Sequence, residues 1–210
     1  MTEKAIEETY KLARPGDAVE TVKRNAMSAI AKFGADRLNF CLFDLFSSKR
    51  LATEIKIGDV FRIDLSGDFR GYFSDLTRLA VVGKPEKKLL DAYKKYIGVY
   101  REIMEMMRPG KRMCDVYEFY QRRFKEEGVI PRAGSHIGHS LGTTHHEYPM
   151  ISSAIEEQLV PNMVIDLEPC AFFPDLGGCR IQVEDTIRIT NDKPEVLSTY
   201  ANTDELYIVV

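Results

Sequence analysis

The strongest constraint on the fold is a segment that occurs twice along the chain, 94 residues apart. Arg14-Pro15-Gly16 precedes an amphipathic stretch that ends at Gly34, and Arg108-Pro109-Gly110 precedes another that ends at Gly128. In each stretch the apolar residues recur at steps of three and four, which predicts a helix with one buried face. Because the spacing is about half the chain, the repeat predicts two halves of helix and sheet packed about a pseudo-twofold axis. A chance similarity of two short motifs is the alternative.

The remaining pattern predicts an α+β fold in which helices cover antiparallel sheet. A third helix is expected from Pro85 to Met107, where apolar residues again recur at helical spacing. Residues 60–64 and 164–168 are short strands introduced by turn residues. Residues 60–82 are expected to form a hairpin centred on Asp68-Phe69-Arg70-Gly71, and residues 180–190 a single alternating strand.

Composition excludes several classes of protein. The 210 residues, 44% hydrophobic and 29% charged, suit one globular domain and neither a disordered tail nor a membrane span. The chain begins without the basic and apolar regions of a signal peptide, so we expect neither secretion nor insertion. A net charge of −3 argues against a nucleic-acid partner. Four scattered cysteines indicate small buried residues in a reducing cytoplasm.

Two acidic residues of the expected hairpin stand out. Centring the hairpin as above places Asp64 directly opposite Asp75, with Cβ atoms roughly 5 Å apart. Carboxylates so placed repel each other unless a cation lies between them. The alternative is that both lie exposed on a solvated hairpin face.

Further acids occur at strand positions in the second half. Glu168 ends the strand at 164–168, and the alternation of residues 180–190 places Glu184, and not Asp185, on the polar face. Asp166 has the same phase as Glu168, but it sits deeper in its strand and is ranked below Glu168 as a candidate ligand. Both halves therefore offer carboxylates on strand faces.

All four histidines lie within eleven residues, at His136, His139, His145 and His146. Imidazole beside carboxylates is the ligand set of Mn²⁺, Co²⁺, Fe²⁺ or Zn²⁺. The sequence has no CxxC, HExxH, GxSxG, P-loop or GxGxxG motif, which removes structural zinc, zincin, serine hydrolase, NTPase and dinucleotide-binding interpretations. The four acids at positions 64, 75, 168 and 184 carry a charge of −4, which two divalent cations would cancel.

These residues resemble the pita-bread metallopeptidases of family M24, which include methionine aminopeptidase, prolidase, aminopeptidase P and creatinase. The matching pieces are five motifs in the same order: Asp64-x10-Asp75, His139 in Gly-His-Ser-Leu-Gly, His146-Glu147-x-Pro149, Glu168-Pro169 and Glu184-Asp185-Thr186. The resemblance implies the duplicated α+β fold. It also implies five metal ligands, of which Asp75 and Glu184 bind both ions: Asp64, Asp75, His139, Glu168 and Glu184.

The chain also departs from that family. The prolidase branch, which it resembles most, has a separate domain before the catalytic one, so residues 1–210 are expected to be a single catalytic domain, either stand-alone or a fragment. The peptidases carry a further histidine in the first half, where this chain has Ser47 or Ser48. Gln182 stands where the branch usually has arginine, with Arg180 displaced by one strand period.

The resemblance predicts metal-assisted hydrolysis of an amide bond, with Xaa-Pro peptides as the leading substrate class. Two ions roughly 3.5–4 Å apart would share a water and lower its pKa. Glu168 would carry the proton to the leaving nitrogen, and His146 would hydrogen-bond the developing oxyanion. His136 or His145 would make a second such contact or serve a structural role, and both alternatives stay open.

Two other functions are weighed against this one. Relatives of this fold hydrolyse or cleave small non-peptide molecules, and the missing histidine and Gln182 favour that alternative. A catalytically inactive binding scaffold is the third, although all five ligand positions hold competent residues. The expected partner is a small peptide or amide, with neither nucleic acid nor membrane, and a homodimer is an open alternative to a monomer.

Overall fold

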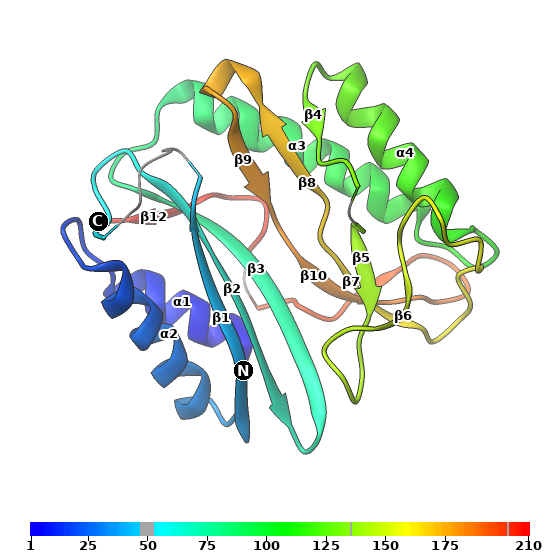
Figure 1. Cartoon of the computed structure of the whole chain (residues 1–210), viewed down its shortest axis with the longest axis horizontal. Coiled ribbons are helices and arrows are strands. Elements are labelled where there is room, and N and C mark those ends of the chain that lie inside the picture. The colour runs from blue at the N-terminus through cyan, green and yellow to red at the C-terminus, as the bar shows by residue number, and fades with distance from the viewer. Residues whose placement is uncertain (47–52, 135, 201) are drawn as a thin grey trace.

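The structure is a computed structural model of the chain and describes residues 1–46, 53–134, 136–200 and 202–210. Two halves of helix and sheet lie side by side, with α1 and α2 on the outer side of one and α3 and α4 on the outer side of the other (Figure 1). The three helices predicted from the sequence are confirmed as α2, α3 and α4. The helical elements described are α1 (Thr2–Leu12), α2 (Val19–Lys32), α3 (Lys87–Met106), α4 (Met113–Glu126) and the short 3₁₀ helix η1 (Pro174–Leu176).

The strands form three sheets. The first half holds the order β1-β2-β3-β12, and the second half holds β11-β10-β7-β5-β6 and β4-β8-β9. Pairing between the described strands is antiparallel except between β3 and β12, which run parallel because the whole second half separates them along the chain. The strand bounds are β1 (Arg37–Leu45), β2 (Val60–Phe69), β3 (Tyr72–Val82), β4 (Ile130–Pro131), β5 (Gly138–Ser140), β6 (Glu147–Met150), β7 (Val164–Leu167), β8 (Cys170–Phe173), β9 (Cys179–Gln182), β10 (Asp185–Arg188), β11 (Glu195–Val196) and β12 (Tyr207–Val209).

The internal repeat corresponds to a repeated backbone frame. Before α2, the N–H of Gly16 donates to the carbonyl of Ile55 over 2.8 Å. Before α4, the N–H of Gly110 donates to the carbonyl of Leu159 over 2.9 Å. Each helix thus begins beside an extended segment of its own half that follows it in the chain. The matching bonds support duplication over chance similarity of the two motifs.

Each repeated helix also ends in the same way. Gly34 after α2 and Gly128 after α4 have positive φ values of 98° and 71°, a conformation that favours glycine. Their N–H groups donate to the carbonyls of Ala31 and Lys125, three residues back in both cases. The glycines that marked the ends of the repeat in the sequence therefore stop both helices.

Each half has its own hydrophobic core. In the first, α1 and α2 pack on one face of β2 and β3, where Phe61, Ile63 and Leu65 are fully buried. In the second, α3 and α4 cover the other sheets with buried aromatic residues such as Tyr96 and Phe124. Because side chains alternate along a strand, the face of β2 opposite Phe61 and Ile63 carries Asp64 and points toward the second half.

The hairpin of β2 and β3 has a different register from the one predicted. Asp64 pairs with Thr77, so Asp75 is a diagonal neighbour of Asp64 on the same face and not its direct partner. The reason is a two-residue turn at Arg70 and Gly71, with φ values of 52° and 81°, which lets β2 continue to Phe69. The prediction of direct opposition was wrong, although both acids share one face.

The single strand predicted for residues 180–190 is also wrong. It divides into β9 and β10, which belong to different sheets, and Glu184 lies between them. There the N–H of Glu184 donates to the carbonyl of Thr77 on β3 over 3.1 Å. This bond joins the two halves and places the Glu184 side chain beside those of the hairpin.

Other sequence expectations are met only in part. No helix in the described part of the chain is long and apolar enough to cross a bilayer. All four cysteines are free, with Cys114, Cys170 and Cys179 buried and Cys41 partly buried. The cytoplasmic location stays a prediction.

Candidate metal centre

A cavity of about 440 Å³ opens between the two halves, and acids and histidines from both line it. β2 and β3 contribute from the first half. The second half contributes β5 and the loop after it, Glu168 directly after β7, Gln182 at the end of β9, and Glu184 between β9 and β10. The cavity brings together the residues predicted as metal-binding or catalytic: Asp64, Asp75, His139, His146, Glu168 and Glu184.

His139 lies at the centre of this group and is buried. Its Nδ1 is 3.2 Å from the carbonyl oxygen of Ser140. Because a carbonyl oxygen only accepts, Nδ1 carries the proton and Nε2 presents a lone pair. Nε2 lies 4.0 Å from Oε1 of Glu168 and 3.9 Å from Oε1 of Glu184. Burial lowers the pKa of His139 to about 4, so a neutral ring faces two carboxyl groups.

Asp75 and Glu184 occupy the buried floor of the cavity. The N–H of Leu76 donates to Oδ1 of Asp75 over 2.9 Å, and Nε2 of His145 is 2.5 Å from its Oδ2. The Thr77 hydroxyl donates to Oε2 of Glu184 over 2.8 Å. Burial, reinforced by the neighbouring acids, raises the pKa of both carboxyl groups well above its usual value.

Asp64 and Glu168 have partners outside the acidic group. Nη1 of Arg62 is 3.0 Å from Oδ2 of Asp64. Burial raises the pKa of Asp64 to about 6, against the opposing effect of Arg62. Glu168 lies between His136, whose Nδ1 is 3.2 Å from Oε1, and Gln182, whose amide donates to Oε2 over 2.8 Å. Burial favours a higher pKa for Glu168, but the contact with His136 leaves it below the usual value.

Asp166 joins the same group, although its sequence position had ranked it below Glu168. It is fully buried on β7, directly paired with His139 on β5. One of its oxygens lies within 4.8 Å of ligand atoms of Asp75, His139 and Glu184. Burial raises the pKa of Asp166 to about 8, although the Thr186 hydroxyl on the paired strand is near enough to lower it in part.

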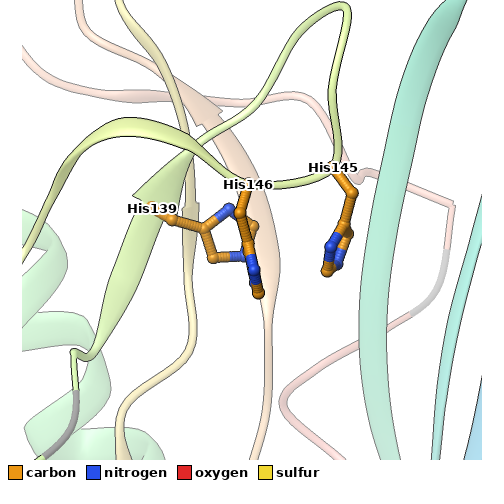
Figure 2. Close-up of side chains that lie close together, drawn as sticks. All are labelled: His139, His145 and His146. Carbon is orange, nitrogen blue, oxygen red and sulfur yellow. The ribbon is translucent and has the colours of Figure 1, made fainter.

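The remaining histidines stand along the rim of the cavity. Figure 2 shows His139 on β5 and His145 and His146 on the loop that follows it, with the three rings close together. Ring centroids are 4.1 Å apart for His139 and His146 and 3.9 Å for His145 and His146. His145 also packs edge-on against Phe40 of β1. Of the three rings, that of His146 is the most exposed, and it is the one best placed to touch a molecule in the cavity.

The arrangement fits divalent metal ions. Ligand atoms bound to one ion at about 2.0–2.2 Å lie roughly 4 Å apart or less, which matches the distances from His139 to Glu168 and Glu184. Oδ1 of Asp64 and both oxygens of Asp166 are buried without a hydrogen-bond partner among the described residues. Buried carboxylates of this kind are costly unless a cation compensates them. Oxygen-rich ligation with one imidazole suits Mn²⁺, Co²⁺, Fe²⁺ or Zn²⁺.

Sequence reasoning did not single out two side chains that support the site. Arg62 and Thr77 each lie two residues from a predicted ligand on the same strand face, and this period-2 spacing was the available signal. Ser47 and Ser48, the positions expected to replace the family's first-half histidine, lie outside the described residues.

Comparison with known proteins gives the same family over most of the chain. The sequence profile described as "Metallopeptidase family M24" matches residues 1–191. The chain is 36% identical over 138 residues to an Xaa-Pro dipeptidase of Pyrococcus furiosus, an alignment that covers 66% of this chain and 39% of the relative. It is 27% identical over 207 residues to an uncharacterized peptidase of Staphylococcus aureus strain MW2, covering 95% of this chain and 58% of the relative.

Solved structures confirm the predicted pita-bread fold. The X-Pro aminopeptidase of Thermotoga maritima superposes with a TM-score of 0.87 at 20% identity, covering 99% of this chain and 60% of that one. The prolidase of Pyrococcus furiosus gives a TM-score of 0.82 at 25% identity, covering 95% and 61%. The chain thus spans about two fifths to three fifths of the length of these relatives. Its assignment as a single catalytic domain stays a prediction.

Proposed function

The chain belongs to metallopeptidase family M24, and on that premise we propose that it is a dinuclear metal-dependent hydrolase that cleaves an amide bond, with Xaa-Pro peptides as substrates. One observation carries the proposal: in one cavity a neutral imidazole lies within 4.0 Å of two carboxyl groups of the second half, Glu168 and Glu184, and within 4.8 Å of a carboxyl group of the first half, Asp75. The cavity volume of about 440 Å³ lies within the range of small-molecule sites, about 300–1,000 Å³.

The proposed metal ligands are Asp64, Asp75, His139, Glu168 and Glu184, with Asp75 and Glu184 shared between the two ions. Bound ions would activate a water and polarise the substrate carbonyl as Lewis acids. The choice among Mn²⁺, Co²⁺, Fe²⁺ and Zn²⁺ follows from the donor atoms, which permit each of them.

Glu168 is proposed to accept a proton from the attacking water and pass it to the leaving nitrogen. The contact with His136 keeps its pKa below the usual value, so the carboxylate is ionised and able to accept. The amide of Gln182 fixes the other carboxylate oxygen. These two contacts orient the group toward the cavity.

His146 is proposed to hydrogen-bond the carbonyl oxygen of the substrate as negative charge develops there. Partial burial lowers the pKa of His146, so the ring is neutral at pH 7 and keeps one N–H to donate. Its exposed position beside His139 and His145 leaves it free to reach a substrate. His145, by contrast, is engaged with Asp75, which favours a structural role for that ring.

The test is elemental analysis of protein purified without chelator, followed by hydrolysis assays at several metal loadings. We expect bound divalent metal and release of the first residue from Xaa-Pro dipeptides in preference to Met-Xaa peptides. Metal-containing protein that cleaves neither class would overturn the peptidase proposal, and protein without metal would support an inactive scaffold.

A second candidate is hydrolysis or cleavage of a small non-peptide molecule by the same site. The observation that favours it is the absence of any histidine before His136, so the first half gives the cavity no imidazole. Adding guanidino-acid and cyclic-amidine substrates to the same assays separates the two candidates, because each predicts turnover of one substrate class and not of the other.

A further inference from the structure

Asp166 is a buried acid to which the described side chains around it offer no hydrogen bond. Its side chain is fully buried, and neither carboxylate oxygen has a hydrogen-bond partner in the described part of the chain. The nearby Thr186 hydroxyl donates instead to the backbone carbonyl of Asp75 over 3.4 Å. A carboxyl group in this position needs a compensating partner that the protein itself does not supply.

Other buried acids close by do have such partners. Asp185, on the neighbouring strand β10, is 2.6 Å from Nη2 of Arg78 and accepts hydrogen bonds from Tyr100 and Ser198. Asp68, at the far end of β2, accepts a bond from Arg37 over 2.9 Å. The lack of a partner is therefore a property of Asp166 and not of buried acids in this fold generally.

The strand register directs Asp166 into the candidate metal centre. Asp166 pairs with His139 across β7 and β5, so the two side chains lie next to each other on one face. Single ligand atoms of Asp75, His139, Asp166 and Glu184 all lie within 4.8 Å of one another. All four residues are buried, and two neighbouring strands, a hairpin and the segment before β10 hold them in place.

Two of the proposed ligands are less free than Asp166. Asp64 is in contact with the Arg62 guanidinium, and Glu168 is held by His136 and Gln182. An ion that binds either oxygen of Glu168 or Oδ2 of Asp64 competes with these protein contacts, which leaves only Oδ1 of Asp64 without one within the described residues. An ion that binds Asp166 displaces no hydrogen bond of that carboxylate.

We propose that Asp166 is a metal ligand, and that with Asp75, His139 and Glu184 it forms the tighter of the two ion sites. This inference rests on the proposed metal-dependent function and adds a ligand to the five that the family resemblance implies. Three carboxylates and one imidazole suit Mn²⁺, Fe²⁺, Co²⁺ or Zn²⁺.

The test compares Asp166→Asn with the matched variant Asp68→Asn, which removes a buried charge outside the cavity. Chelator-treated proteins are titrated with Mn²⁺ by calorimetry, and Co²⁺ binding is followed by its visible absorption spectrum. For Asp166→Asn we expect at least about tenfold weaker binding in the tightest step and an altered Co²⁺ spectrum. Asp68→Asn should bind within about twofold of the wild type.

Thermal unfolding separates ligation from a fault in folding. Because Asp166→Asn replaces a buried carboxyl group that has no hydrogen-bond partner among the described residues with an amide of similar shape, its metal-free form should unfold near the wild-type temperature, while its gain on adding Mn²⁺ should shrink. If Asp166→Asn fails to fold, Asp166→Ser replaces it in the same comparison. Unchanged Mn²⁺ affinity in the folded variant overturns the role of Asp166 alone, whereas a wild type without metal affinity overturns the proposed function as well.

Discussion

The two halves of the chain share a backbone frame but contribute different chemistry. In each, a Pro-Gly segment precedes a helix that ends at a glycine of positive φ, and the same hydrogen bonds hold the helix to its own half. The first half gives the cavity Asp64 and Asp75 from one long hairpin. The second gives the cavity imidazoles and two acids, Glu168 and Glu184, from short strands and loops, with Asp166 buried beside them.

The two halves can contribute different side chains because the shared frame depends on backbone hydrogen bonds. Backbone bonds build the shared frame, so the side chains on the strand faces are free to differ between the halves. A hairpin of ten- and eleven-residue strands holds two acids in a fixed diagonal relation. The short strand β5 and the loop after it instead bring three histidine rings together, which a continuous strand with alternating faces does not do (Figure 2).

The most severe test removes one shared ligand from each half. Asp75→Asn and Glu184→Gln should each reduce the metal content of purified protein to less than about a tenth of the wild-type value, because each carboxylate is proposed to bind both ions. Elemental analysis measures this, with Asp68→Asn as the control. Full metal content in Asp75→Asn alone would show that the second half binds metal without the first.

The next largest effect, on the free energy of unfolding, is expected for Arg78, which joins the two halves. Arg78 on β3 donates to the carbonyl of Glu184 over 2.5 Å and pairs with Asp185 over 2.6 Å, and both side chains are buried. Arg78→Leu should lower the free energy of unfolding by about 3–5 kcal/mol, because it leaves Asp185 buried and uncompensated. Urea unfolding measures this. The double variant Arg78→Leu/Asp185→Leu should recover part of the loss, and no recovery would contradict the explanation.

The next prediction concerns His146, a residue of the second half that is proposed to donate a hydrogen bond to the developing oxyanion. His146→Gln should lower kcat about 100-fold, near 3 kcal/mol of transition-state stabilisation, because it removes a proposed donor to the developing oxyanion. Metal content should stay at the wild-type level, since His146 is not a proposed ligand. Steady-state kinetics with elemental analysis checks both, and loss of metal would instead place His146 among the ligands.

The pH dependence of metal-free protein tests the buried acids. Burial raises the pKa of Asp166 to about 8, above its value in the unfolded chain, so its contribution to stability is present at low pH and lost as pH rises through 8. Between pH 6.5 and 8 the free energy of unfolding should fall by up to about 2 kcal/mol.

The same measurement on metal-loaded protein is the control. Bound ions hold the carboxylates deprotonated, so this fall should disappear. Histidines oppose the trend only below about pH 6.5, because the pKa values of His139 and His145 are lowered to about 4 by burial. An equal slope with and without metal would mean that the acids of the cluster do not cause it.

The smallest effects are expected at the glycines that end the two repeated helices, and they test whether the two positions are equivalent. Gly34→Ala and Gly128→Ala should each cost about 1 kcal/mol of stability, because alanine disfavours the positive φ that both positions require and open space surrounds both. Gly98→Ala, inside α3 with ordinary φ, should instead be neutral or stabilising. Chemical denaturation measures all three, and clearly unequal costs at Gly34 and Gly128 would break the equivalence of the halves.

The sequence predicted the duplication, the three main helices and the fold because helical periodicity and turn glycines are local signals. It did not predict the hairpin register, which depends on a non-glycine residue, Arg70, adopting positive φ. It also merged β9 and β10, since alternation alone does not reveal a change of sheet at Glu184.

The residue types of the candidate site could be predicted from the sequence, but the contacts among them could not. Depth along a strand placed Asp166 below Glu168, but the neighbour across the sheet decides which acids meet His139, and that pairing is a tertiary property. The contacts of Arg62 with Asp64 and of Gln182 with Glu168 likewise arise only when the chain is folded.

The bond from the Glu184 amide to Thr77, with the Thr77 hydroxyl returning to the Glu184 carboxylate, has a mechanical consequence. A cation held by Asp75 and Glu184 would act there as a removable cross-link between the duplicated lobes. Loading and stripping the ion would then change how independently the lobes fluctuate, so hydrogen exchange along β3 and β10 would report occupancy even where no substrate is turned over.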